Sequence, residues 1–195
     1  QGSIQSGQDV SCEVDLQRQK TACNHSATHL LHAALRLVLG EHVVQKGSLV
    51  TPQRLRFDFS HSQPLTSAQL FEIENIVNAK IQAALLVQAD IMPFAEAKSQ
   101  GVMALFTEKY QEQVRVLSMG TFSKELCGGI HVANTAHIGL FVIVEETGIA
   151  QGVRRIEAYT GEYALAYYQG FRQHIHEIAS TLKVSSDQVV TKVAQ

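Results

Sequence analysis

The spacing of apolar residues predicts three long or medium helices. Residues 21–39 repeat apolar positions with a helical period and stop before Gly40, a residue type that often follows a helix end. A second helix is expected over residues 66–86, where Thr66 can cap the first turn. The third helix is expected over residues 161–182.

Strands are predicted between these helices. Over residues 49–59 we expect one or two strands with Pro52 at a turn, because apolar and charged side chains alternate there. Further short elements are expected as strands over residues 89–93, 114–119, 140–145 and 153–158, and as a short helix over 95–99. The helices and strands do not alternate strictly, which favours an α+β fold with a mainly antiparallel sheet packed with helices.

Composition adds a few exclusions to this picture. The chain has 195 residues, 45% of them apolar and 17% charged, with a formal net charge of −2. This balance does not favour a protein that coats nucleic acid by bulk charge. No apolar run approaches the ~20 residues of a membrane span, so we expect no membrane partner. The three cysteines are widely spaced and odd in number, which indicates a reducing compartment rather than a disulfide framework.

His25 and His29 form the first candidate site. Two histidines four residues apart lie on one face of a helix and can bind one metal ion. With His25 at zero on a helical wheel, His29 falls near ~40° and His32 near ~340°. The apolar Leu31 and Leu35 fall on the opposite side, so we expect His25 and His29 to face a cleft or solvent rather than the core.

Cys127 and His131 form the second half of this site. Two glycines between them allow the chain to bend so that the thiolate and the imidazole converge. Either pair is a weak signal alone, but together they supply four ligands of the kind that Zn²⁺ takes in a tetrahedral site. Ligand number leaves open whether the metal is structural or catalytic. A zinc protease motif is excluded because Ser26, not Glu, follows His25, and the deaminase signature is absent.

Two other polar segments are candidates for a binding role. Residues 45–48, Gln-Lys-Gly-Ser, are expected to form a polar turn that contains glycine. Arg154 and Arg155 are adjacent on a predicted strand and therefore point to opposite faces. One of them could hold a phosphate or carboxylate, or the two could be a structural Arg–Glu pair and a solvated arginine.

Seven segments in a fixed order resemble the editing domain of bacterial alanyl-tRNA synthetase: NHSATHLLHAAL, QKGSLV, LRFDFSH, ALFTEKY, RVLSMG, SKELCGGIH and GVRRIEAYTG. The wider family includes a threonyl-tRNA synthetase domain and the free-standing AlaX trans-editing proteins, and the last segment favours the alanyl enzyme. The similarity covers residues 18–161. Residues 1–17 are expected to be a linker and residues 162–195 the helical start of a C-terminal segment. With no initial Met, we expect a fragment of a longer synthetase.

The resemblance implies hydrolysis of the ester that joins a wrong amino acid, serine or glycine, to tRNA(Ala). It implies zinc ligands His25, His29, Cys127 and His131, catalytic residues Cys127, His131 and Gln45, and substrate-binding residues Thr28, Gln45 and Ser48. The implied partners are the acceptor end of tRNA(Ala) and the rest of an ATP-dependent synthetase, in the cytoplasm. Two alternatives stay open: a free-standing trans-editing deacylase, and a non-catalytic tRNA-binding module stabilised by zinc.

Two positions depart from the pattern of the family. The chain has Ile130 where the family usually has Thr in CGGTH, and Thr135-Ala136 where a Thr-Gly pair is common. Ile130 removes a hydroxyl that the resemblance implies beside the metal, and this substitution bears on the polarity of the pocket. None of the four ligand positions is changed.

Overall fold

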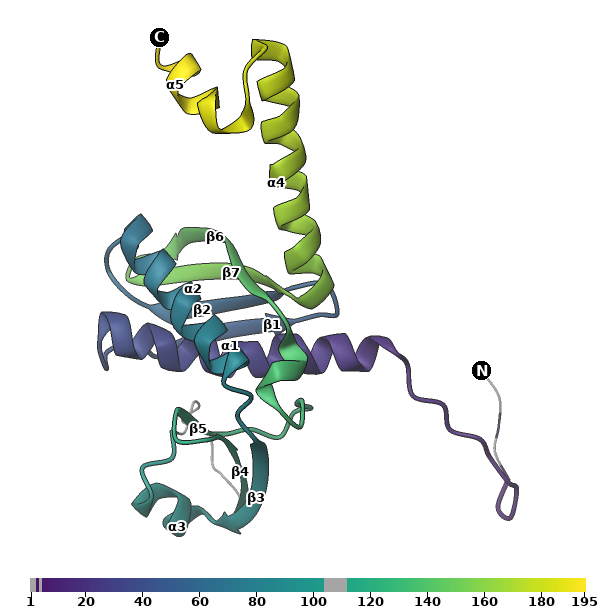
Figure 1. The fold of residues 1–195 in the computed structure, drawn as a ribbon. Helices are drawn as coiled ribbons and strands as arrows, with labels where there is room; N and C mark the ends of the chain where they lie inside the picture. Colours follow the sequence, from purple (N-terminus) through teal and green to yellow (C-terminus); the bar gives the residue numbers. More distant parts are fainter. Residues whose placement is uncertain (1–2, 4, 104–111) are drawn as a thin grey trace.

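The computed structural model describes residues 3, 5–103 and 112–195, and contains two antiparallel sheets beside a long helix (Figure 1). The larger sheet has the order β1-β2-β7-β6 and the smaller one β3-β4-β5. The strands are β1 (Gln45–Val50), β2 (Leu55–Ser60), β3 (Val87–Pro93), β4 (Gln113–Met119), β5 (Ser123–Leu126), β6 (Phe141–Ala150) and β7 (Val153–Thr160). The helices are α1 (Gln17–Leu39), α2 (Ser67–Gln82), α3 (Phe94–Ser99), α4 (Gly161–Leu182) and α5 (Val189–Val193), with 3₁₀ turns η1 (Thr135–Ile138) and η2 (Ser186–Gln188).

The main core lies between the larger sheet and the helices α1 and α2. Phe57 and Ile156 are paired neighbours on β2 and β7, point to the same face and are fully buried. The apolar stripe of α1, including Leu31 and Leu35, packs in the same cluster, as does Ile73 of α2. The expected α+β fold is confirmed.

Asn24 fixes α1 to the larger sheet. Its side-chain amide nitrogen donates to the carbonyl oxygens of Thr51, at 2.8 Å, and Pro52, at 3.3 Å. Its amide oxygen accepts a hydrogen bond of 2.8 Å from the hydroxyl of Thr160. Asn24 is only 1% exposed, so these bonds satisfy a buried polar group and also set where α1 lies.

The smaller sheet is joined to the main core through one face of β4. Leu117 and Met119 belong to the main cluster, whereas Val114 and Val116 pack with Ala97 of α3 in a separate small cluster. This arrangement brings the end of β5, and the loop that follows it, against α1 (Figure 1).

Several expected elements are confirmed, and others differ from the expectation. The helix over residues 161–182 is confirmed, while α1 begins earlier than expected, at Gln17. Residues 45–48 are not a turn but the start of β1, because pairing with β2 draws them into the ladder through a bulge at Gln45/Gly47.

The single expected sheet is in fact two sheets, and the third strand of the smaller one was not expected. β5 has only four residues, too few for an alternating pattern to be read. The segment ALFTEKY, residues 104–110, lies outside the described residues. Within the described ranges, no helix combines the length and apolar character needed to cross a membrane.

Candidate metal centre

Four potential ligands from two distant segments meet beside α1. His25 and His29 lie one turn apart on the helix, and Cys127 and His131 lie on the loop after β5. In the part of the chain that the structure describes, one ligand atom from each residue lies within 4.8 Å of the others. The structure therefore brings together the four residues that the two sequence motifs predicted.

Cys127 lies at the centre of this group. Its Sγ is 3.2 Å from Nε2 of His131 and 3.6 Å from Nε2 of His25, and the backbone N–H of Gly129 points at it from 3.5 Å. Burial raises the pKa of the thiol, but hydrogen bonds from His131 and His25 and the positive charge of nearby His29 outweigh burial and lower the pKa to about 3. The sulfur is therefore a thiolate at neutral pH, the form that binds metals.

His29 is more deeply placed than the helical wheel predicts. His25 is partly exposed and both histidines line a cleft, but His29 is 4% exposed because β5 covers that face of α1. Its Nδ1 donates to Oε2 of Glu125 at 2.8 Å, and its buried Nε2 has no hydrogen-bond partner among the described residues. Burial lowers the pKa of His29, yet Cys127 and Glu125 more than offset this and raise the pKa to about 9.

Glu125 is a buried carboxylate that the sequence analysis did not single out. It is 2% exposed and also accepts a hydrogen bond of 3.0 Å from Nδ1 of His32, itself 1% exposed. Burial raises the pKa of Glu125, but His29 and His32 together lower it to about 2. Its position two residues before Cys127, in SKELCGGIH, is the sequence signal that could have drawn attention to it.

His131 is held from its other side by Ser26. The hydroxyl of the fully buried Ser26 lies 3.2 Å from Nδ1 of His131 and accepts the backbone N–H of Val132 at 3.1 Å. Burial lowers the pKa of His131, and the charges of His25 and His29 lower it further, to about 4. The imidazole of His131 is therefore neutral at pH 7, the form that binds a metal ion, whereas His29, with its raised pKa, would release a proton on binding one.

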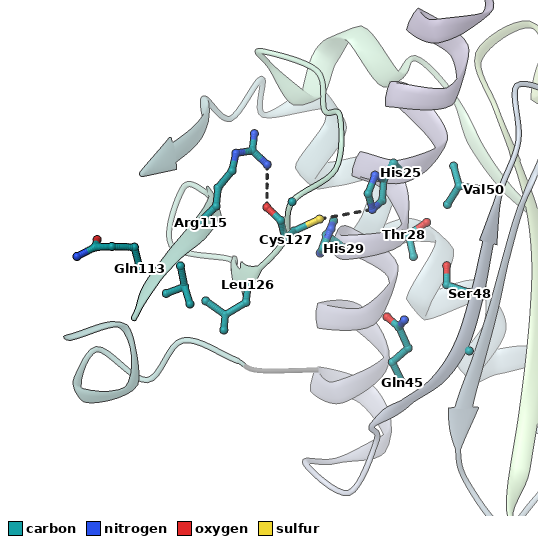
Figure 2. A pocket seen from close by; sticks show the side chains of 13 residues that line it. His25, Thr28, His29, Gln45, Ser48, Val50, Gln113, Arg115, Leu126 and Cys127 are labelled. Atoms are coloured by element: carbon teal, nitrogen blue, oxygen red, sulfur yellow. Dashed lines mark hydrogen bonds between the residues drawn. The ribbon is translucent and has the colours of Figure 1, made fainter. Parts of the chain in front are cut away.

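The Gly-Gly loop owes its position to a close approach and to one arginine. A Cβ on Gly129 would lie 2.6 Å from Nδ1 of His25, whereas a Cβ on Gly128 would meet no described atom within 4 Å. Nη1 of Arg115, on β4, donates to the carbonyl oxygen of Cys127 at 2.7 Å (Figure 2). The same nitrogen donates to the carbonyl oxygen of Gly129 at 3.0 Å. Sequence reasoning did not identify Arg115, since its role depends on the pairing of β4 with β5.

A cleft of about 720 Å³ opens beside the four ligands, between α1, β1 and the smaller sheet (Figure 2). Thr28, Gln45 and Ser48, the residues that the resemblance implied for substrate binding, line one side of it, and Val50, Val114 and Leu126 supply apolar walls. The Thr28 hydroxyl donates to the carbonyl oxygen of Asn24 at 2.9 Å, so towards the cleft it can only accept a hydrogen bond.

Comparison with known proteins agrees with the motifs. Residues 114–157 match the family described as the threonyl and alanyl tRNA synthetase second additional domain. The chain is 55% identical over 195 residues to an alanine–tRNA ligase of Nitrosococcus oceani, covering 100% of this chain and 22% of that protein. It is 53% identical over 195 residues to the ligase of Acidithiobacillus ferridurans, with the same 100% and 22% coverage. The resemblance is confirmed. This chain is similar to a region of alanine–tRNA ligases that includes the second additional domain, and it spans about a fifth of their length.

Some features predicted from the sequence lie outside the site. Arg154 pairs with Glu146, and Arg155 pairs with Asp58 through two hydrogen bonds of 2.7 and 2.8 Å, so both arginines are structural. Ile130 packs against the main core and is not among the residues that line the cleft.

The donor set of this site fits Zn²⁺. One thiolate and three imidazoles give the number and softness of ligands that zinc prefers. The buried Nε2 of His29, with no partner in the described structure, is the kind of atom that a metal ion would satisfy. The residues present therefore fit the group that the sequence predicted.

Proposed function

We propose that this chain is the editing region of an alanine–tRNA ligase and hydrolyses the ester of serine or glycine on tRNA(Ala). The observation that carries the proposal is the cleft, where three of the four candidate ligands, His25, His29 and Cys127, share the lining with the polar side chains of Thr28, Gln45 and Ser48. Its volume of about 720 Å³ exceeds what a serine or glycine residue needs, which leaves room for the sugar that carries the ester. The tRNA partner would place the activity in the cytoplasm.

The proposed zinc ion would be held by His25, His29, Cys127 and His131. Bound there, zinc would act as a Lewis acid towards water or the ester, or would orient the end of the substrate. Cys127 and His131 contribute to the reaction as ligands, because the contacts of His131 with Ser26 and Cys127 engage both of its ring nitrogens.

Gln45 is our candidate for the group that orients water and steadies the ester. An aminoacyl ester is already activated, so the site needs mainly to place a water and stabilise the oxyanion that forms. The side chain of Gln45 projects from β1 towards α1 and lines the cleft (Figure 2). Its amide can donate to the developing oxyanion and accept from the attacking water.

Selection of serine against alanine would rest on the polar side of the cleft. A serine hydroxyl can donate to Oγ1 of Thr28, which still has lone pairs free to accept. It can also exchange hydrogen bonds with Ser48. An alanyl ester would desolvate these groups without replacing their bonds with water, which disfavours its binding. Glycine is admitted because it is smaller than serine, and editing is needed because one methyl gives the synthetic site little discrimination.

Deacylation of seryl-tRNA(Ala) tests the proposal directly. The chain is expected to release serine from seryl-tRNA(Ala) and to act much more slowly on alanyl-tRNA(Ala). Cys127→Ala removes a ligand and should lose activity, while Cys12→Ala, at an exposed cysteine, should keep it. Equal deacylation by Cys127→Ala and the unsubstituted chain, or none by either, would contradict the proposed activity.

A second candidate is a non-catalytic tRNA-binding module stabilised by zinc. The completeness of the four-ligand set favours it, because structural zinc sites are closed whereas catalytic ones keep a position for water. It predicts bound zinc and tRNA affinity without release of serine. We favour an editing region that acts within a longer synthetase over a free-standing deacylase. The reason is that the chain matches only 22% of the length of its relatives.

A further inference from the structure

Glu125 places one carboxylate between two histidines of α1. Oε2 accepts the Nδ1–H of His29 at 2.8 Å and Oε1 accepts the Nδ1–H of His32 at 3.0 Å. The side chains of all three residues are at most 5% exposed. A buried carboxylate needs such donors, and here each oxygen receives one.

We infer that Glu125 is a positioning residue for the metal centre, acting through His29. A hydrogen bond at Nδ1 turns the imidazole so that Nε2 is the nitrogen presented to Cys127 and the other ligands. A carboxylate in this position also fixes the tautomer and makes the ligating nitrogen a better donor. The inference rests on the metal site proposed above and assigns a role to a residue that does not touch the metal.

His32 holds the carboxylate in place. Its ring packs on Phe57, with centroids 5.2 Å apart, and its Nδ1 is directed at Glu125. Its Nε2 has no partner in the described part of the chain, so the bond to Glu125 is the polar contact that this buried ring makes there. Without His32, one carboxylate oxygen would be buried without a donor, and Glu125 would be free to turn away from His29.

A purely structural role for this triad makes a different prediction. If Glu125 only joined β5 to α1, its replacement would lower stability but would leave the affinity of the folded protein for zinc unchanged. A positioning role requires the affinity itself to fall, together with a change at the His29 ring. These two observations separate the two roles.

The test compares Glu125→Gln with the matched control Glu146→Gln. Glu146 is also largely buried, with its side chain 6% exposed, but it pairs with Arg154 outside the metal centre. Zinc affinity is measured by competition with a chromophoric chelator, using only variants whose circular dichroism is native. We expect Glu125→Gln to bind zinc about 10- to 100-fold more weakly, as for other residues that orient metal-bound histidines. Glu146→Gln should bind as the unsubstituted chain does.

His32→Phe provides a second variant that keeps the contact with Phe57 and removes the donor to Glu125. It should weaken zinc binding less than Glu125→Gln does. Unchanged zinc affinity in a folded Glu125→Gln variant would overturn the inference and leave the metal site standing. Absence of zinc binding by the unsubstituted chain would instead overturn the metal site, and with it this inference.

A measurement on the unsubstituted chain covers the case in which Glu125→Gln does not fold. Nitrogen-15 NMR of labelled histidine in the zinc-loaded chain should show a proton on Nδ1 of His29 and metal on Nε2. Metal on Nδ1 of His29, with the proton on Nε2, would contradict the geometry that Glu125 imposes. If the unsubstituted chain bound zinc but released no serine, that result would contradict the proposed hydrolysis and leave the role of Glu125 standing.

Discussion

Gly129 lies so close to the His25 ring that the loop and the helix can approach only where a side chain is missing. A Cβ there would be 2.6 Å from Nδ1 of His25, well inside van der Waals contact. The neighbouring Gly128 has open space around the same position. Two adjacent glycines therefore differ in what they contribute to the metal centre.

We expect Gly129→Ala to displace His25 and to weaken zinc binding by about tenfold or more, the loss expected when one ligand is misplaced. Gly128→Ala is the matched control and should bind zinc normally. Chelator competition measures both. Equal affinities for the two variants would mean that the loop relaxes away from His25 at little cost.

The thiolate of Cys127 gives a second prediction for single residues. Since neighbouring histidines lower its pKa to about 3, the thiol is ionised throughout the range from about pH 5 to pH 8. In metal-free chain, its alkylation by iodoacetamide should therefore vary little with pH over that range. An ordinary thiol gains thiolate about tenfold per pH unit below its pKa of about 8.5. Peptide mapping measures each cysteine separately, and zinc should protect Cys127; a tenfold rise per pH unit at Cys127 would contradict the prediction.

Among the elements, α1 carries two of the four candidate metal ligands, and the buried side chain of Asn24 fixes its position in the fold. Asn24 joins the helix to the turn between β1 and β2 and to the end of β7. Asn24→Ala would leave the carbonyl of Thr51 and the hydroxyl of Thr160 without these partners. We expect it to lower the free energy of unfolding by about 2–3 kcal/mol, measured by urea denaturation. A change below about 0.5 kcal/mol would show that water replaces the lost bonds.

A substitution at the N-terminus of α2, a helix that holds none of the metal ligands, should affect stability less than Asn24→Ala does. Thr66 forms a reciprocal capping box with Gln69, in which each side chain accepts a backbone N–H of the other. Thr66→Ala should lower the free energy of unfolding by about 1 kcal/mol. Zinc affinity should stay the same, because α2 carries none of the four ligands. A parallel loss of affinity would contradict this expectation.

For the whole molecule, the metal centre links α1 and the larger sheet to the loop of the smaller sheet. Two ligands come from each side, so a bound ion would hold the two parts together. At a zinc concentration about 100 times the dissociation constant, binding stabilises the fold by about 2.7 kcal/mol. We therefore expect Tm to fall on chelation and to recover with added zinc.

The same treatment should raise amide hydrogen exchange first in β4 and β5, which flank the cleft. Cys127→Ala serves as the control, since its Tm should respond little to chelator or zinc. A metal-independent Tm in the unsubstituted chain would contradict the proposed link between the two sheets.

The sequence by itself determined the local parts of this protein. His25 and His29 are four residues apart, so the helical period places them on one face of a helix. The Gly-Gly pair predicts a bend between Cys127 and His131. The helix over residues 161–182 and the antiparallel character were predicted for the same reason, because periodicity and turn residues act over short distances.

Only the tertiary structure decided how these parts combine. Residues 45–48, which we expected to form a turn, pair with β2 and belong to a strand that lines the cleft. Pairing with β4 places Glu125 within hydrogen-bonding distance of His29. Arg115 reached the Gly-Gly loop through the same pairing. Strand register and the packing of one sheet against a helix depend on contacts between residues far apart in the chain, and no local pattern encodes those contacts.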